Sequence, residues 1–112
     1  MKRGEIWWVS LPEPYGSEPG FRRPMLIVQS DSFNNSAIKT VLCVALTTNL
    51  NLGHAPGNVQ ITPRNSGLPK PSVVNVSQVV TVDRTLMTER IKRLDAETMQ
   101  RVDYGIRLVL SL

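Results

Sequence analysis

Two adjacent arginines and a proline, Arg22-Arg23-Pro24, directly precede the apolar run at residues 25–28. A guanidinium group is planar and permanently charged, and its donors match the oxygens of a phosphate. At the start of a buried strand, such a group can bind a phosphate or stabilise charge that develops on a reacting phosphoryl group. The pair therefore indicates an enzyme or a binding protein that acts on nucleic acid. The alternative is a solvated surface pair without a function.

Two threonines, Thr47 and Thr48, follow a second apolar run. RNA carries its own nucleophile, the ribose 2′-hydroxyl, so a protein can cleave RNA by aligning that oxygen with the phosphorus and by stabilising the charge that forms. The guanidinium of Arg23 and the hydroxyl of Thr47 or Thr48 are candidates for such a site. The competing interpretation of residues 47–49 is a strand end followed by a turn.

Other common chemistries lack the residues they need. His54 is the only histidine and Cys43 the only cysteine, which argues against a zinc site and against a ribonuclease that works with two histidines. The nine carboxylates are scattered, which argues against two-metal catalysis. We therefore expect no metal ion and no cofactor.

The composition predicts one folded domain over residues 1–112. No apolar stretch approaches the roughly 20 residues of a membrane span, and the chain starts with strand-like sequence instead of a signal core. These features and the single cysteine favour a cytoplasmic protein that does not enter a membrane. The net charge is +4, and residues 1–80 hold seven basic against four acidic residues, so we expect this part to bind a polyanion.

The elements that must position these groups are mainly strands. Hydrophobic patterns predict them over residues 5–11, 24–29, 39–46, 57–62 and 72–82. The third is apolar on both faces, as is typical of a central strand. In the last, apolar residues alternate with polar ones and place Asn75, Ser77 and Thr81 on one face. The segments 12–21 and 47–56 are predicted loops, which we expect to select the RNA sequence.

A terminal helix is predicted after Asp95, a good N-cap residue. Its apolar stripe, which we expect to pack on the sheet, consists of Met99, Val102, Ile106 and Val109. The sequence offers no reason for Gly105 within it. Trp7 and Trp8 should point to opposite faces of their strand, so that at most one packs in the core. The predicted fold is a mostly β, antiparallel small barrel or half-barrel with a C-terminal helix.

The chain resembles the MazF/PemK family of toxin endoribonucleases, the toxic halves of bacterial toxin–antitoxin pairs. The resemblance covers nearly the whole chain and depends on the order and spacing of short motifs. These motifs are Arg3-Gly4-Glu5-Ile6-Trp7, Gly16-Ser17-Glu18, Arg23-Pro24 with residues 25–28, Ala45-Leu46-Thr47, Ser72-Val73-Val74 with Gln78, Thr81-Val82-Asp83 and Leu94-Asp95.

This resemblance implies a small SH3-like barrel of the CcdB/PemK type, a homodimer, and metal-independent cleavage of single-stranded mRNA to 2′,3′-cyclic phosphate and 5′-hydroxyl ends. It also implies inhibition by a cognate MazE-like antitoxin, through which the complex would bind operator DNA. The family's catalytic arginine and threonine match Arg23 and Thr47. Arg23 would stabilise the phosphorane and protonate the leaving oxygen, and Thr47 would orient the phosphate.

Eight further residues are expected to bind RNA, namely Ser17, Glu18, Arg22, Thr48, Asn49, Asn75, Ser77 and Gln78. The similar PemK/Kid branch has histidine, arginine and aspartate as its proposed acid–base set, where this chain aligns Ser17, Asn75 and Ser77. The chain thus looks more similar to the chromosomal MazF branch, and the resemblance assigns no general base.

Two other functions are compatible with this architecture. One is a non-enzymatic toxin of the same fold that acts on DNA gyrase. CcdB-like action depends on a C-terminal Trp-Gly-Ile, whereas this sequence has Leu110-Ser111-Leu112, which argues against it. The other is a binding module whose catalysis has decayed.

Overall fold

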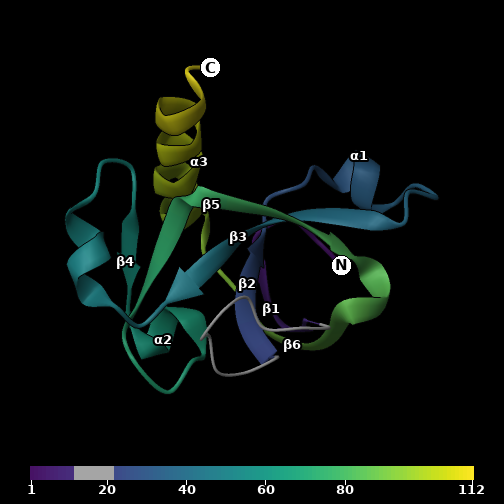
Figure 1. Ribbon diagram of the computed structural model, residues 1–112, viewed down its shortest axis with the longest axis horizontal. Coiled ribbons are helices and arrows are strands. Elements are labelled where there is room, and N and C mark those ends of the chain that lie inside the picture. Colours follow the sequence, from purple (N-terminus) through teal and green to yellow (C-terminus); the bar gives the residue numbers. More distant parts are fainter. Residues whose placement is uncertain (12–21) are drawn as a thin grey trace.

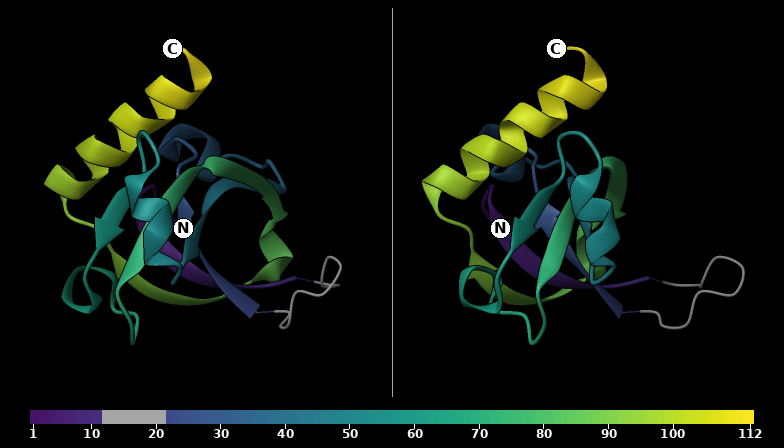
Figure 2. Two further views of the ribbon diagram at one scale, coloured as in Figure 1. Left: turned by 60° about the vertical axis from the view of Figure 1, so that its left-hand side comes forward. Right: turned by 90° about the vertical axis from the view of Figure 1, so that its left-hand side faces the viewer.

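A single curved antiparallel sheet makes up most of the structure. The computed structural model describes residues 1–11 and 22–112, so the predicted loop 12–21, with Ser17 and Glu18, lies outside the described residues. The six strands are β1 (Glu5–Ser10), β2 (Arg22–Ile27), β3 (Thr40–Thr47), β4 (Val59–Ile61), β5 (Ser72–Asp83) and β6 (Met87–Arg93). They follow the order β4-β5-β3-β2-β1-β6, and the sheet curls into the predicted half-barrel (Figures 1 and 2).

Helices occupy the connections and the C-terminal part of the chain. The short ones are α1 (Asp31–Asn34), η1 (Leu50–His54), α2 (Pro63–Ser66) and η2 (Arg84–Leu86), and the long one is α3 (Ala96–Leu110). Helix α3 crosses one side of the sheet (Figure 2). Within residues 1–11 and 22–112, no helix has the length and apolar character needed to span a membrane.

Apolar side chains are buried on both faces of the sheet. Along β1, Ile6 and Trp8 pack in one cluster, which α3 covers with Val102, whereas Trp7 and Val9 pack in a second cluster on the other face. The two tryptophans do point to opposite faces, as predicted. The expectation that only one could pack in the core is wrong, because the curved sheet encloses apolar residues on both sides.

Strand β3 is central, as its sequence predicts. Val44 and Leu46 belong to the first cluster, and Val41 and Cys43 to the second. Burial raises the pKa of the Cys43 thiol to about 12, so this cysteine acts as a small apolar side chain and not as a nucleophile.

The sequence patterns did not reveal β6. Of its seven residues, only Met87 is buried and Ile91 partly buried. It lies at one edge of the sheet, where exposed charged side chains are common because they discourage pairing with other chains. A strand of this kind lacks the apolar alternation by which half-buried strands are recognised.

Helix α3 starts as predicted and ends differently. The Asp95 side chain accepts a hydrogen bond from the Thr98 N–H at 2.7 Å, and the Thr98 bonds hold the pKa of this carboxyl below its usual value. Met99 and Ile106 pack against the first cluster. The prediction for Val109 is wrong, because its side chain is 42% exposed where the helix extends beyond the sheet (Figure 2).

Gly105 has a structural reason that the sequence did not provide. Its backbone lies directly against Gly57, which has a φ of +83° and precedes β4. A Cβ atom at Gly105 would stand 2.1 Å from the Gly57 carbonyl oxygen. Two glycines therefore allow α3 to approach the sheet at backbone contact distance.

We predict that Gly105→Ala destabilises the fold by about 1–3 kcal/mol, because the overlap outweighs the better helix propensity of alanine. Urea denaturation followed by circular dichroism measures this loss. Gln100→Ala, at an exposed position of the same helix, is the matched control and should leave the stability nearly unchanged. If Gly105→Ala and the wild type had the same free energy of unfolding, the close backbone contact between Gly105 and Gly57 would be contradicted.

A buried carboxylate connects β1 to β6 and to the N-terminal segment. Glu5 accepts hydrogen bonds from the Lys2 N–H at 2.9 Å, the Trp7 indole at 3.0 Å and Arg90 Nε at 2.7 Å. Burial acts to raise the pKa of Glu5, but these bonds together outweigh it and hold the pKa below its usual value. The ionised form therefore stabilises the folded state.

Because the folded-state pKa of Glu5 is lowered, its contribution is present above pH 4.5 and is lost as the pH falls through the folded-state pKa. We predict that Glu5→Gln lowers the free energy of unfolding by about 1–3 kcal/mol at pH 7. The difference in the free energy of unfolding between Glu5→Gln and the wild type should become smaller by pH 3. Denaturant titrations at both pH values measure this difference. A difference that is equal at pH 7 and pH 3 would refute the proposed contribution of the ionised Glu5 carboxylate.

Candidate active site

The candidate site lies where the pairing of β2 with β3 ends. The last paired residues are Met25 and Ala45, and the next residue of β2 is Pro24, which has no backbone N–H to continue the ladder. Continuing the same antiparallel register would set Arg23 opposite Thr47. Directly opposed residues share a face of the sheet, so this register would bring the arginine and the threonine to the same face.

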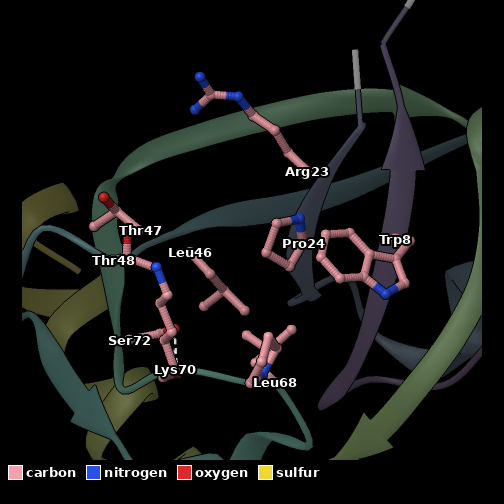
Figure 3. A pocket seen from close by; sticks show the side chains of 10 residues that line it. Trp8, Arg23, Pro24, Leu46, Thr47, Thr48, Leu68, Lys70 and Ser72 are labelled. Carbon is pink, nitrogen blue, oxygen red and sulfur yellow. Dashed lines mark hydrogen bonds between the residues drawn. The ribbon is translucent and has the colours of Figure 1, made fainter. Parts of the chain in front are cut away.

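An open pocket occupies this end of the sheet and holds about 380 Å³. Its apolar part is lined by Trp8, Pro24, Leu46, Leu68 and Pro69, and its polar part by Arg23, Thr47, Thr48, Lys70 and Ser72. In Figure 3 the Arg23 and Thr47 side chains lie on opposite sides of the opening, above the apolar side chains. The volume is near the lower limit for ligand sites and suits a group of about one nucleotide.

The charged residues that line this pocket, Arg23 and Lys70, are both cationic. Among the residues that the structure describes, no carboxylate lines it. A pocket with two cations and hydroxyl groups attracts an anion, and phosphate matches these donors.

Thr47 is held by a local turn at the end of β3. Its hydroxyl oxygen accepts a hydrogen bond from the Asn49 N–H at 3.1 Å. A hydroxyl that accepts one bond can still donate its proton to another acceptor. The turn therefore orients Thr47 while leaving it able to donate to a phosphate oxygen.

Arg22 is engaged outside the pocket. Its guanidinium lies 4.7 Å from the centre of the Trp8 ring and contacts a Glu89 carboxylate oxygen at 2.7 Å. Trp8 itself lines the pocket, so Arg22 supports one of its walls. The two arginines thus occupy different environments despite being adjacent in sequence.

Four other predicted RNA-binding residues, Asn49, Asn75, Ser77 and Gln78, do not line the pocket. The Asn49 side chain caps η1 through the Asn51 N–H. On β5, Asn75 stands opposite Ala45 and accepts a hydrogen bond from the Ser77 hydroxyl at 2.8 Å. Ser77 and Gln78 are exposed at a bulge in the β3–β5 pairing. The structure therefore gathers Arg23, Thr47 and Thr48 in one pocket and leaves these four outside its lining.

Two lining residues, Lys70 and Ser72, are not among the site residues predicted from the sequence. Lys70 belongs to the segment between α2 and β5, and Ser72 is the first residue of β5, so both are far from Arg23 in sequence. The only sequence signal is Pro69-Lys70-Pro71, which places a cation between two rigid residues.

In the described parts of the chain, no group of three or more His, Cys, Asp or Glu side chains gathers as a metal site would require.

Comparison with known proteins identifies the relatives of this chain. It is 43% identical to the endoribonuclease MazF6 of Mycobacterium tuberculosis over 112 residues, which cover all of this chain and 98% of that protein. It is 32% identical to the endoribonuclease EndoA of Bacillus subtilis, covering all of this chain and 96% of that protein.

Solved structures show the same fold. The structure of a mycobacterial endoribonuclease in complex with its cognate antitoxin superposes with a TM-score of 0.81 at 23% identity, and the match covers all of this chain and 96% of that one. A MazF from Deinococcus radiodurans gives a TM-score of 0.77 at 18% identity, covering all of this chain and 97% of that one.

The family profile itself extends over residues 2–110 and includes the strands, the pocket and α3. Together with the 43% identical relative, this match shows that the chain belongs to the PemK-like, MazF-like toxin family of type II toxin–antitoxin systems.

Proposed function

We propose that this protein is an endoribonuclease toxin that cleaves single-stranded mRNA without a metal ion. The observation that carries the proposal is that Arg23 of β2 and Thr47 of the neighbouring β3 line the same open, cation-lined pocket. Membership of the toxin family and relatives named as endoribonucleases support the reaction class.

In the proposed reaction, the ribose 2′-oxygen attacks the adjacent phosphorus and the bond from phosphorus to the 5′-oxygen breaks. The 2′-hydroxyl loses its proton and the 5′-oxygen gains one, which leaves a 2′,3′-cyclic phosphate and a 5′-hydroxyl. Arg23 stabilises the charge on the phosphorane and supplies a proton to the leaving oxygen, while Thr47 orients the phosphate. The proton released by the 2′-hydroxyl passes to solvent water, and the guanidinium regains its own proton from solvent, so the protons balance. This step consumes no water and requires no metal ion.

The RNA on either side of the cleaved bond would contact the surface around the pocket. Thr48 lines the pocket itself, and Arg22 stands behind Trp8. The other proposed contacts are Asn49, Asn75, Ser77 and Gln78, together with Ser17 and Glu18 outside the described residues. Unpaired bases are read by side chains of this kind, which offer amide and hydroxyl groups for hydrogen bonding.

We further propose a cytoplasmic homodimer that a MazE-like antitoxin inhibits, with operator DNA bound through the antitoxin. The complex of a structural neighbour with its cognate antitoxin supports such a partner. The exposed apolar residues near the end of α3 support a protein interface there: Tyr104, Leu108, Val109, Leu110 and Leu112.

For a homodimer, the molar mass measured by light scattering should be twice the chain mass of 12.5 kDa.

We predict that Arg23→Ala lowers kcat/KM for RNA cleavage by at least about 100-fold, because the developing phosphorane charge loses its main donor. Sequencing of the cut ends of a long RNA locates the sites, and single-turnover assays on a short RNA give the rates. Arg101→Ala, an exposed arginine on α3, removes the same charge and should retain wild-type activity. Wild-type cleavage by Arg23→Ala would refute the assignment.

A separate measurement tests the chemistry. Cleavage should continue in EDTA, and the 5′ ends should accept phosphate from polynucleotide kinase without prior dephosphorylation, because they carry a hydroxyl. Loss of activity in EDTA, with recovery on adding a divalent metal, would overturn the metal-independent mechanism. Absence of cuts in RNAs of varied sequence would favour a binding function instead.

A further inference from the structure

Lys70 is the second cation of the pocket, and its position is built into the fold. It belongs to the segment that joins α2 to β5, and Figure 3 shows its side chain extending from this segment toward Thr47 and Thr48 at the end of β3. The residue is exposed, so its ammonium group is open to a ligand. Arg23 approaches the same opening from β2.

The segment that carries Lys70 is fixed at both ends. On one side, the Ser66 hydroxyl accepts a hydrogen bond from the Leu68 N–H at 3.0 Å, and Leu68 is buried in the first cluster. On the other side, the buried Ser72 hydroxyl donates to the Lys70 carbonyl oxygen at 3.1 Å.

The prolines beside Lys70 add to this restraint. Pro69 and Pro71 have fixed φ angles, and a residue before proline is restricted to extended conformations. The backbone of Lys70 is thus held by its neighbours, and only the side chain has to be ordered by a ligand. Such preorganisation lowers the entropy cost of binding.

The two cations suit different tasks. The planar guanidinium of Arg23 can follow two oxygens of a reacting phosphate, whereas an ammonium on a flexible stem is a point charge that suits electrostatic binding. The Thr47 and Thr48 side chains lie between Lys70 and Arg23 at this end of β3 and offer hydroxyl donors to the same anion.

We propose that Lys70 is a phosphate-binding residue of this site, which pairs with the RNA backbone in the ground state and places the phosphate against Thr47 and Thr48. This inference rests on the proposed ribonuclease function and extends it by a residue from a different part of the chain. Lys70 raises affinity for every RNA sequence alike, because a phosphate contact carries no base information.

The test uses a fluorescent single-stranded RNA that contains a mapped cut site with 2′-deoxyribose at the cleaved nucleotide, so that it binds without being cut. Lys70→Gln should weaken binding roughly three- to tenfold at about 0.1 M salt. Each phosphate contact to a single strand contributes about 0.7 to the slope of log K against log salt concentration, so the slope should fall by about 0.7.

Two variants separate charge from structure. Lys70→Arg keeps the charge and should restore both the affinity and the slope. Lys39→Gln removes an exposed lysine that precedes β3, at the opposite end of that strand from Thr47, and should change neither. In cleavage assays, Lys70→Gln should raise KM and leave kcat within about threefold, because it removes binding that is equal in the ground and transition states.

The outcomes distinguish the inference from the function on which it rests. A wild-type protein that cuts no RNA would overturn the proposed function and this inference with it. Cleavage by the wild type, combined with an unchanged salt slope and affinity in Lys70→Gln, would overturn the role of Lys70 alone. Unfolding curves that match the wild type show that the variant is folded.

Discussion

The site depends on a break in backbone pairing between two central strands. Pro24 has no N–H, so the ladder between β2 and β3 ends at Met25 and Ala45. Had the ladder continued, Arg23 and Thr47 would pair as ordinary neighbours within the sheet. Because it stops, their side chains border an open pocket with an apolar floor, and the rigid strands behind them still fix their register.

The rest of the fold keeps this end of the sheet stiff. Apolar residues are buried on both faces, so β2 and β3 are supported from two sides. The backbone contact between Gly57 and Gly105 brings α3 close to the sheet, and the Glu5 carboxylate connects β1 to β6. Strand β1 also carries Trp8, which forms one wall of the pocket. Contacts that hold β1 in place therefore help to fix the shape of the pocket.

The neighbouring residues Arg22 and Arg23 lie in different surroundings. Arg22 lies against Trp8 and Glu89, which neutralises part of its charge outside the pocket. Arg23 and Lys70 line the pocket without a carboxylate among the described lining residues. The two cations come from opposite sides of the opening, on a strand and on a proline-restrained segment. This arrangement lets a phosphate be bound and then stabilised as its charge increases.

The sequence by itself determined the family, the central strand and the N-cap of α3, because local patterns and motif spacing carry this information. It also predicts roles for Arg23 and Thr47. It did not indicate β6, whose polar composition hides an edge strand, or the exposure of Val109 beyond the sheet. Only the tertiary structure explains why residue 105 is a glycine, and only the tertiary structure brings the Lys70 side chain toward Thr47. Both depend on segments far apart in the chain, and such contacts leave no periodic trace in the sequence.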